Sequence, residues 1–203
     1  MRDKKVKALS DMTLEELWQL FPITLVPHRP EWKEWAGAEI AGLEKLLEKF
    51  RPVINHIGST AIPDIKAKPI VDLLVELPPD ADRGEVRTLM EADGYICMAE
   101  TARRMSFNKG YTPAGYAEKV FHIHIHETGD NDEIRFRNLL ITNPPVAREY
   151  EALKLSLLPR YRNDRDAYTG AKTPFITRIL TTSQDQFGMP QDLSTSNGIL
   201  GDV

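Results

Sequence analysis

The stretch His56–Leu77 constrains the fold more than any other part of the sequence, because it combines a tight loop with a strongly patterned strand. From Pro69 onward the residues alternate between two faces, as expected of a β-strand. One face carries Val71, Leu73, Val75 and Leu77, and the other carries Ile70, Asp72, Leu74 and Glu76. Asp72 therefore interrupts an apolar face. An isolated buried charge is very costly, so this carboxylate must be paired, hydrogen-bonded or bound to a metal.

The loop that precedes this strand carries groups that bind anions. Gly58 allows the backbone to approach a ligand closely, and Ser59 and Thr60 offer hydroxyl and N–H groups. Lys66 and Lys68 bring positive charge to the same loop. The pattern predicts a site for phosphate and metal. The alternative is an ordinary Gly-Ser-Thr turn beside a half-exposed strand.

A second run, residues 120–127, places three histidines on one face of a predicted strand. His122, His124 and His126 alternate with apolar residues. Two histidines at positions i and i+2 lie about 7 Å apart, which allows them to converge on one Zn, Mn or Fe ion. A solvent-exposed sheet face would carry the same pattern, so that alternative stays open.

Two further basic residues are candidates for phosphate contacts. Arg104 follows Arg103 between two short predicted strands, 95–98 and 105–107, and an arginine can pair with phosphate through two hydrogen bonds. A solvated hairpin tip is the alternative. Lys172 lies near the start of the last predicted helix, where its charge opposes the helix dipole. This placement suggests that Lys172 faces an anion.

Together these motifs resemble the GrpB family. The resemblance rests on His56–Thr60, Pro63, Lys68-Pro69, Asp72 and the histidine pair, and it extends over roughly residues 24–180. It implies the nucleotidyltransferase fold, an α+β domain with a mixed, mainly antiparallel sheet of about five strands and helices packed on it. It also favours His122 and His124 as ligands over His126, because the family usually has an apolar residue at that last position.

The chain departs from the usual nucleotidyltransferase pattern at the second carboxylate. Such enzymes usually carry two carboxylates two residues apart on one strand, and both bind Mg²⁺. Here Leu74 follows Asp72 at that spacing. Glu76 lies about 13 Å away along the strand, and Glu127 falls on the opposite face from His122 and His124. A two-metal site of the usual form is therefore not expected.

The two patterned strands are expected to meet. If the apolar faces of both strands point to the same helices, then Asp72, His122 and His124 share the opposite face. Neighbouring strands lie about 5 Å apart, so the imidazoles would reach the carboxylate. We expect that carboxylate to raise the pKa of the histidines, unless a metal holds the rings neutral, and we expect the C-terminal helices with Lys172 to cover the site.

We therefore expect a divalent-metal-dependent, nucleotidyltransferase-like enzyme that acts on a nucleoside triphosphate. The cofactor is expected to be Mg or Mn, with Zn as the alternative. Asp72 and Ser59 are the predicted catalytic residues. The predicted metal ligands are Asp72, His122 and His124, and the predicted phosphate-binding residues are Gly58, Ser59, Thr60, Lys68, Arg104 and Lys172. Two alternatives stay open: an inactive nucleotide-binding module, favoured by the missing carboxylate, and a histidine-centred metalloenzyme.

Length, charge and cysteine content restrict the domain organisation, the partners and the location of the protein. The 203 residues suit one domain, expected over 13–182, between a flexible N-terminus (1–12) and a disordered tail (183–203). A net charge of −4 disfavours nucleic acid as the main partner, so we expect a nucleotide or another phosphorylated small molecule. The single Cys97 excludes an internal disulfide, and no apolar run approaches the ~18 residues of a membrane span. These features predict a cytoplasmic protein with no membrane partner.

Overall fold

A computed structural model describes residues 7–187, which form one five-stranded sheet with seven α-helices around it. The strands are β1 (Val53–Ile57), β2 (Val71–Leu77), β3 (Ile96–Glu100), β4 (Arg104–Thr112) and β5 (Gly115–Glu127). Their order in the sheet is β1-β2-β5-β4-β3, and only the β2–β5 pair is parallel. The predicted α+β fold with a mixed, mainly antiparallel sheet is confirmed.

The register of the central strands separates an apolar face from a polar one. Asp72 pairs with His122 across the β2–β5 ladder, and Leu74 pairs with His124. Residues that pair directly across a ladder project to the same side of the sheet. The opposite, apolar side carries Val71, Leu73, Val75, Leu77, Met105, Phe107, Phe121, Ile123 and Ile125. The predicted common face of Asp72 and the two histidines is thus present.

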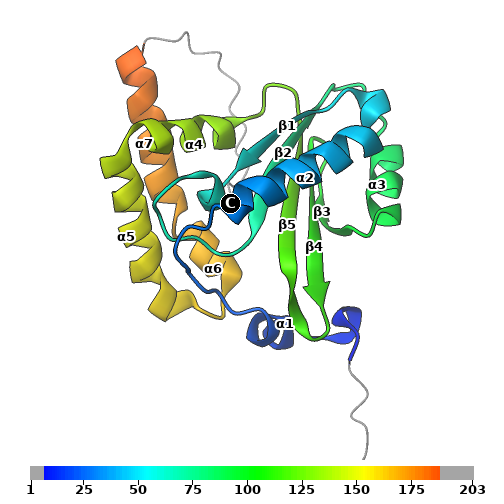
Figure 1. Cartoon of the computed structure of the whole chain (residues 1–203), viewed down its shortest axis with the longest axis horizontal. Coiled ribbons are helices and arrows are strands. Elements are labelled where there is room, and N and C mark those ends of the chain that lie inside the picture. The colour runs from blue at the N-terminus through cyan, green and yellow to red at the C-terminus, as the bar shows by residue number, and fades with distance from the viewer. Residues whose placement is uncertain (1–6, 188–203) are drawn as a thin grey trace, which may run out of the picture.

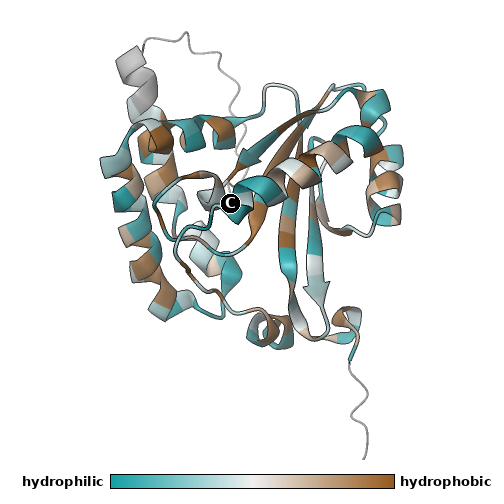
Figure 2. Ribbon diagram, in the orientation of Figure 1, coloured by the Kyte–Doolittle hydropathy of each residue, from teal (hydrophilic) through white to brown (hydrophobic). Residues whose placement is uncertain are grey.

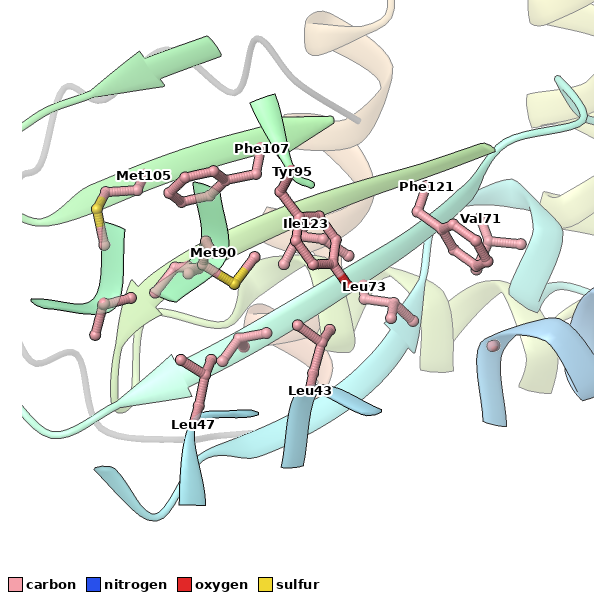
Figure 3. Packing of buried hydrophobic residues seen from close by; sticks show 14 of the residues in the cluster. Leu43, Leu47, Val71, Leu73, Met90, Tyr95, Met105, Phe107, Phe121 and Ile123 are labelled. Carbon is pink, nitrogen blue, oxygen red and sulfur yellow. The ribbon is translucent and has the colours of Figure 1, made fainter. Parts of the chain in front are cut away.

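Two helices cover the apolar face. Helix α2 (Glu31–Leu46) runs across it, and α3 (Arg83–Ala92) packs beside the β3–β4 side (Figure 1). Figure 3 shows Leu43 and Leu47 projecting toward the strands that carry Leu73 and Ile123, in the same core. The hydropathy colouring in Figure 2 places brown residues along the central strands and along parts of α2 and α3. This burial of apolar area is the main contribution to the stability of the sheet.

The C-terminal helices form a second core. They are α4 (Asp132–Thr142), α5 (Pro144–Tyr161), α6 (Arg165–Gly170) and α7 (Thr173–Phe187), and α4, α5 and α7 gather on one side of the sheet (Figure 1). Their shared core also receives two residues of the loop after Ser59. It contains Ile62, Ile65, Phe136, Leu140, Ala147, Tyr150, Ile176 and Leu180. The Gly58-Ser59 loop is therefore held between the sheet and this helical layer.

Several element boundaries differ from the sequence-based expectation. β4 and β5 form one hairpin that is longer at its turn than predicted: β4 continues past Phe107 to Thr112, and β5 begins at Gly115, before Val120. Helix α6 was not predicted, and α7 continues to Phe187, into the expected tail. Residues 1–6 and 188–203, which include most of the predicted flexible ends, lie outside the described residues. None of the described helices has the length and apolar composition that crossing a membrane requires.

Candidate metal and phosphate site

Three metal-ligating side chains converge on the polar face of the sheet. Asp72, His122 and His124 each offer one ligand atom, and these atoms lie within 4.8 Å of one another. All three side chains are buried, with exposures of 8%, 9% and 4%. The His122 Nδ1 atom lies 3.2 Å from Asp72 Oδ1, and His124 Nε2 lies 3.9 Å from the same oxygen. The arrangement follows from the β2–β5 register and joins two motifs that are far apart in sequence.

The His124 ring has an unsatisfied nitrogen that points at the cluster. At 3.9 Å the separation from Asp72 exceeds a hydrogen bond, and the buried Nε2 atom has no hydrogen-bond partner among the described residues. Buried polar atoms are nearly always paired, so an exception needs an explanation. A bound cation is one explanation, because a neutral imidazole nitrogen is a ligand for divalent metals. The residues present therefore fit a metal.

His122 is fixed in orientation by a hydrogen-bonded chain behind it. Its Nε2 atom lies 2.8 Å from the Tyr111 hydroxyl, and Arg165 donates to that hydroxyl at 2.7 Å. Since Nε2 is engaged, Nδ1 faces Asp72. A second polar group on the far ring nitrogen is the usual support of a metal-ligating histidine. The ring is thus oriented before any ligand arrives.

Burial decides the charge state of this histidine. Burial lowers the pKa of His122 to about 4, and the nearby Asp72 carboxylate only partly opposes that effect. The expectation that Asp72 would raise the pKa of its histidine neighbours is therefore wrong for His122, because desolvation of the imidazolium outweighs the charge attraction. Burial alone would raise the pKa of Asp72, but hydrogen bonding to His122 and the proximity of the His124 ring lower it below its usual range. A neutral imidazole and an ionised carboxylate are the states that bind a metal.

The Gly58 turn places its backbone directly against Asp72. Gly58 has φ +69°, and a Cβ atom there would overlap the Asp72 carboxylate. The next residue, Ser59, begins a short 3₁₀ turn over Ser59–Ala61. Within that turn the Thr60 hydroxyl is 2.9 Å from His56 Nε2, so its side chain is engaged. The predicted neighbourhood of the Gly-Ser loop and Asp72 is present in the structure.

Buried lysines approach Ser59 from the helical layer. Lys154 of α5 donates a hydrogen bond of 2.9 Å to Ser59 Oγ and another to the Lys66 carbonyl oxygen. Lys172, just before α7, is also buried, and its pKa is well below the usual value because of burial and the nearby Lys68 and Lys154, while Asp72 opposes the shift. Lys68, Lys154 and Lys172 therefore gather three amino groups near Ser59 and Asp72.

The sequence-based prediction missed Lys154, although a signal for it exists. In α5 an apolar stripe at helical spacing runs through Val146, Tyr150, Leu153 and Leu157. Lys154 follows Tyr150 by one helical turn and so lies on the same face. A lysine inside an apolar stripe is a buried lysine, which requires a polar partner.

Arg104 lies on the same sheet face but apart from the cluster. It pairs with His126 across the β4–β5 ladder, and its guanidinium donates to both carboxylate oxygens of Asp130 at 2.6 and 2.7 Å. Glu76 is likewise engaged, since it accepts hydrogen bonds from the Gly129 N–H and the Asn131 amide. These groups form a second polar network, and a phosphate contact by Arg104 would require breaking its pair with Asp130.

A pocket of about 710 Å³ opens in front of the histidines. Its floor includes His122, His124, Ser106 and Asn108, and α6 contributes Arg165. Its outer walls are apolar and come from α1 (Leu14–Leu20), which a capping box at Thr13 and Glu16 stabilises, and from β3. Of the six large apolar side chains that are exposed in the described part of the chain, three line this pocket: Leu14, Ile96 and Met98. Exposed apolar side chains gathered around a polar floor are typical of a ligand site.

Comparison with known proteins places these residues in a family context. The sequence model of one protein family, described as GrpB protein, matches residues 22–182. A UPF0157 protein of Pseudomonas aeruginosa is 35% identical over 161 residues, which are 78% of this chain and 66% of that protein. Glutamate-rich protein GrpB of Alkalihalophilus pseudofirmus is 36% identical over 164 residues, which are 78% of this chain and 94% of the relative. The chain thus spans just under two thirds of the first relative and nearly all of the second.

Comparison with solved structures also finds a GrpB protein. A crystal structure of GrpB from Enterococcus faecalis has a TM-score of 0.68 and 28% identity, over 82% of this chain and 100% of that chain. The Cid1 poly(U) polymerase overlaps more loosely, with a TM-score of 0.46 and 15% identity over 75% of this chain and 47% of that chain. A likeness as slight as the second assigns no activity.

Proposed function

Because this chain belongs to the GrpB family, we propose that it is a nucleotidyltransferase-like enzyme that uses one divalent cation and acts on a nucleoside triphosphate. The observation that carries the proposal is the convergence of Asp72, His122 and His124 directly beside the Ser59 turn. A metal-ligating set and an anion-binding turn share one polar sheet face. This combination is what a metal-bound phosphate ligand requires.

In this proposal Asp72, His122 and His124 hold the cation. Two imidazoles and one carboxylate favour Mn²⁺ or Zn²⁺ over Mg²⁺, which prefers oxygen ligands. When bound, the ion would neutralise phosphate charge and polarise the phosphoryl oxygens. His122 contributes by being held in one orientation, through Tyr111.

The phosphate groups are proposed to lie against the Gly58–Thr60 turn. Ser59 offers its hydroxyl, and the absence of a side chain at Gly58 lets the backbone approach. Lys68 and Lys172, which interact with each other, are the amino groups proposed to contact the phosphates. The apolar walls of the 710 Å³ pocket would take the base and sugar, since a nucleoside needs both apolar contact and hydrogen-bonding groups such as Ser106 and Asn108.

Two experiments test the proposal. Calorimetry with ATP and UTP, each with and without Mn²⁺, is expected to show nucleotide binding that the cation strengthens. Pyrophosphate release from a nucleoside triphosphate is expected in the wild type and is lost in Asp72→Ala, because that variant lacks the only carboxylate of the proposed cluster. Binding of metal without any nucleotide binding would contradict the proposal.

A histidine-centred metalloenzyme is the second candidate. The observation that favours it is that two imidazoles and one carboxylate form a set of three ligands without a nucleotide. Tight Zn²⁺ or Mn²⁺ binding that nucleotides leave unchanged would support this candidate. Nucleotide binding without pyrophosphate release would instead support an inactive nucleotide-binding module.

A further inference from the structure

Lys154 is a buried amine held in the anion-binding part of the site. Lys154 is 3% exposed. Its Nζ atom donates hydrogen bonds to Ser59 Oγ and to the Lys66 carbonyl oxygen. The centroid of the Tyr150 ring lies 5.0 Å from Nζ. Ser59 thus connects Lys154 directly to the turn where a phosphate would lie.

The charged groups around Lys154 come from every element packed against it. On α5 itself Glu151 is the nearest acidic residue, but its carboxylate accepts a hydrogen bond of 2.7 Å from the Lys66 backbone N–H. Lys68 of the loop and Lys172 before α7 are the neighbouring amines, and the Tyr168 hydroxyl of α6 donates a hydrogen bond to the Lys154 carbonyl oxygen. Asp72, whose charge acts on Lys172, is already engaged with the histidines.

Burial is the main reason that this amine loses its proton easily. It lowers the pKa of Lys154 to about 7, with Lys68 acting in the same direction and Glu151 opposing. At pH 8 such an amine is roughly nine-tenths neutral. A phosphate group at Ser59 would supply a nearby negative charge, which favours the charged form of the amine.

We propose that Lys154 is a phosphate-binding residue that takes up about one proton when a nucleotide phosphate binds at Ser59. The inference rests on the proposed function and adds a specificity: the site favours multiply charged phosphates, because only a strong anion compensates a charged, desolvated lysine. In the absence of phosphate the neutral amine avoids placing a further positive charge beside Lys68. Binding is therefore coupled to pH through Lys154.

The test is calorimetry of ATP with Mn²⁺ at pH 8.0, where ATP itself is fully deprotonated, in Tris and in HEPES. These buffers differ widely in ionisation enthalpy, so proton uptake by the complex appears as a difference between the two observed enthalpies. For the wild type we expect uptake approaching one proton. We also expect affinity to fall roughly tenfold between pH 8 and 9.

Three variants test whether Lys154 is the group that takes up the proton when ATP binds. Lys154→Met fills similar space without an amine and is expected to bind ATP more weakly and to lose most of the proton uptake. Lys154→Arg keeps a permanent charge and is expected to retain more binding than the Met variant, with no proton uptake of its own. Lys66→Met removes an exposed lysine of the same loop, whose backbone alone contacts Lys154, and should behave as the wild type.

The outcomes separate the inference from the proposed function. Equal enthalpies in both buffers, with normal ATP binding, would overturn the role of Lys154 and leave the proposed function intact. Undiminished proton uptake in Lys154→Met would also overturn it. If the wild type binds no ATP at any pH, while circular dichroism shows it folded, both the inference and the proposed function fail.

Discussion

Gly58 and Asp72 illustrate how closely single residues in this site depend on one another. Ile57 pairs with Asp72 across the β1–β2 ladder, so the chain turns away at Gly58 directly over the carboxylate. The positive φ of Gly58 belongs to a conformation that residues with a Cβ rarely adopt. Two independent constraints, backbone conformation and space, therefore require glycine at this position.

The variant Gly58→Ala is expected to lower the free energy of unfolding by at least about 1–3 kcal/mol. The backbone strain accounts for that amount, and the clash of the new methyl group adds to it. It should also displace Asp72 and weaken metal binding. Urea unfolding measures the first effect. Gly37→Ala is the control, because a Cβ at Gly37 on the exposed side of α2 meets nothing within 4 Å, and it is expected to stabilise the protein by up to about 1 kcal/mol. Equal stabilities of the two variants would contradict this account of Gly58.

His56 makes stability depend on pH in a defined direction. Burial lowers the pKa of His56 to about 4, although Asp72 opposes the shift. The unfolded state, with an ordinary pKa near 6.5, then binds more protons than the folded state between about pH 4 and pH 6.5. The free energy of unfolding must therefore fall as the pH falls through that window. The buried rings of His122 and His126, whose pKa values are also lowered, act in the same direction.

Between pH 6.5 and pH 5, His56 alone is expected to contribute a loss of up to about 2 kcal/mol. His56→Gln retains a side chain that can bond to Thr60 but does not titrate, so its stability should vary less steeply with pH. Urea unfolding at half-unit pH intervals measures both slopes. Parallel slopes for wild type and variant between pH 6.5 and pH 5 would show that His56 is not the buried neutral ring described here.

At the scale of the elements, the alternation in β2 and β5 was sufficient to predict which residues share a face. The strict alternation around Asp72 and His122 fixed the polar side of each strand, and the register then brought those sides together. The parallel pairing of β2 with β5 was not predictable, because it depends on how the β4–β5 hairpin folds back between distant segments. For Lys154 the apolar stripe of α5 signals burial, but its contact with Ser59 comes from the packing of α5 against the loop, which the local pattern does not encode.

Helix α6 shows the same limit of local patterns. It is six residues long, and its N-cap residue Asp164 accepts a hydrogen bond from the Ala167 N–H. Its stability and position come from tertiary contacts such as that of Arg165 with Tyr111. Short helices are marginal alone, so a sequence pattern rarely distinguishes them from loops.

Helix α1 lies outside the region matched by the family model, yet it forms one wall of the pocket. None of its residues is fully buried. Deletion of residues 1–20 is therefore expected to change the melting temperature by only a few degrees, whereas it should weaken binding of a nucleotide by removing Trp18 and its neighbours from the pocket. Thermal denaturation and calorimetry measure the two effects. A deletion that binds nucleotide as tightly as the full chain would exclude α1 from the ligand site.

At the scale of the whole molecule, the two cores meet at the candidate site. The first core lies between the sheet and α2, and the second lies among the C-terminal helices. They are connected by polar contacts, among them Lys154 to Ser59 and Arg137 of α4 to the His56 carbonyl oxygen at 2.6 Å. The pocket thus depends on both cores being folded.

We expect the two cores to unfold together. All three tryptophans lie on α1 and α2, so their fluorescence reports on the sheet side, whereas far-UV circular dichroism is weighted toward the helices of both layers. The two signals should give coincident urea transitions. The second-core substitution Phe136→Ala, expected to cost about 3–5 kcal/mol, should shift both together. A fluorescence transition that stays in place while the dichroism transition moves would indicate two independent units.

The central claim is that Asp72, His122 and His124 form one metal site, and a calorimetric titration with Mn²⁺ and with Zn²⁺ at pH 7.5 tests it most directly. His126→Gln is the matched control, because His126 lies on the same strand face but its ring bonds to the Asp130 carbonyl oxygen and lies outside the cluster. The account predicts one bound ion in the wild type and in His126→Gln, and at least a tenfold loss of affinity in both Asp72→Asn and His124→Gln. Binding of equal strength in all four proteins would contradict it.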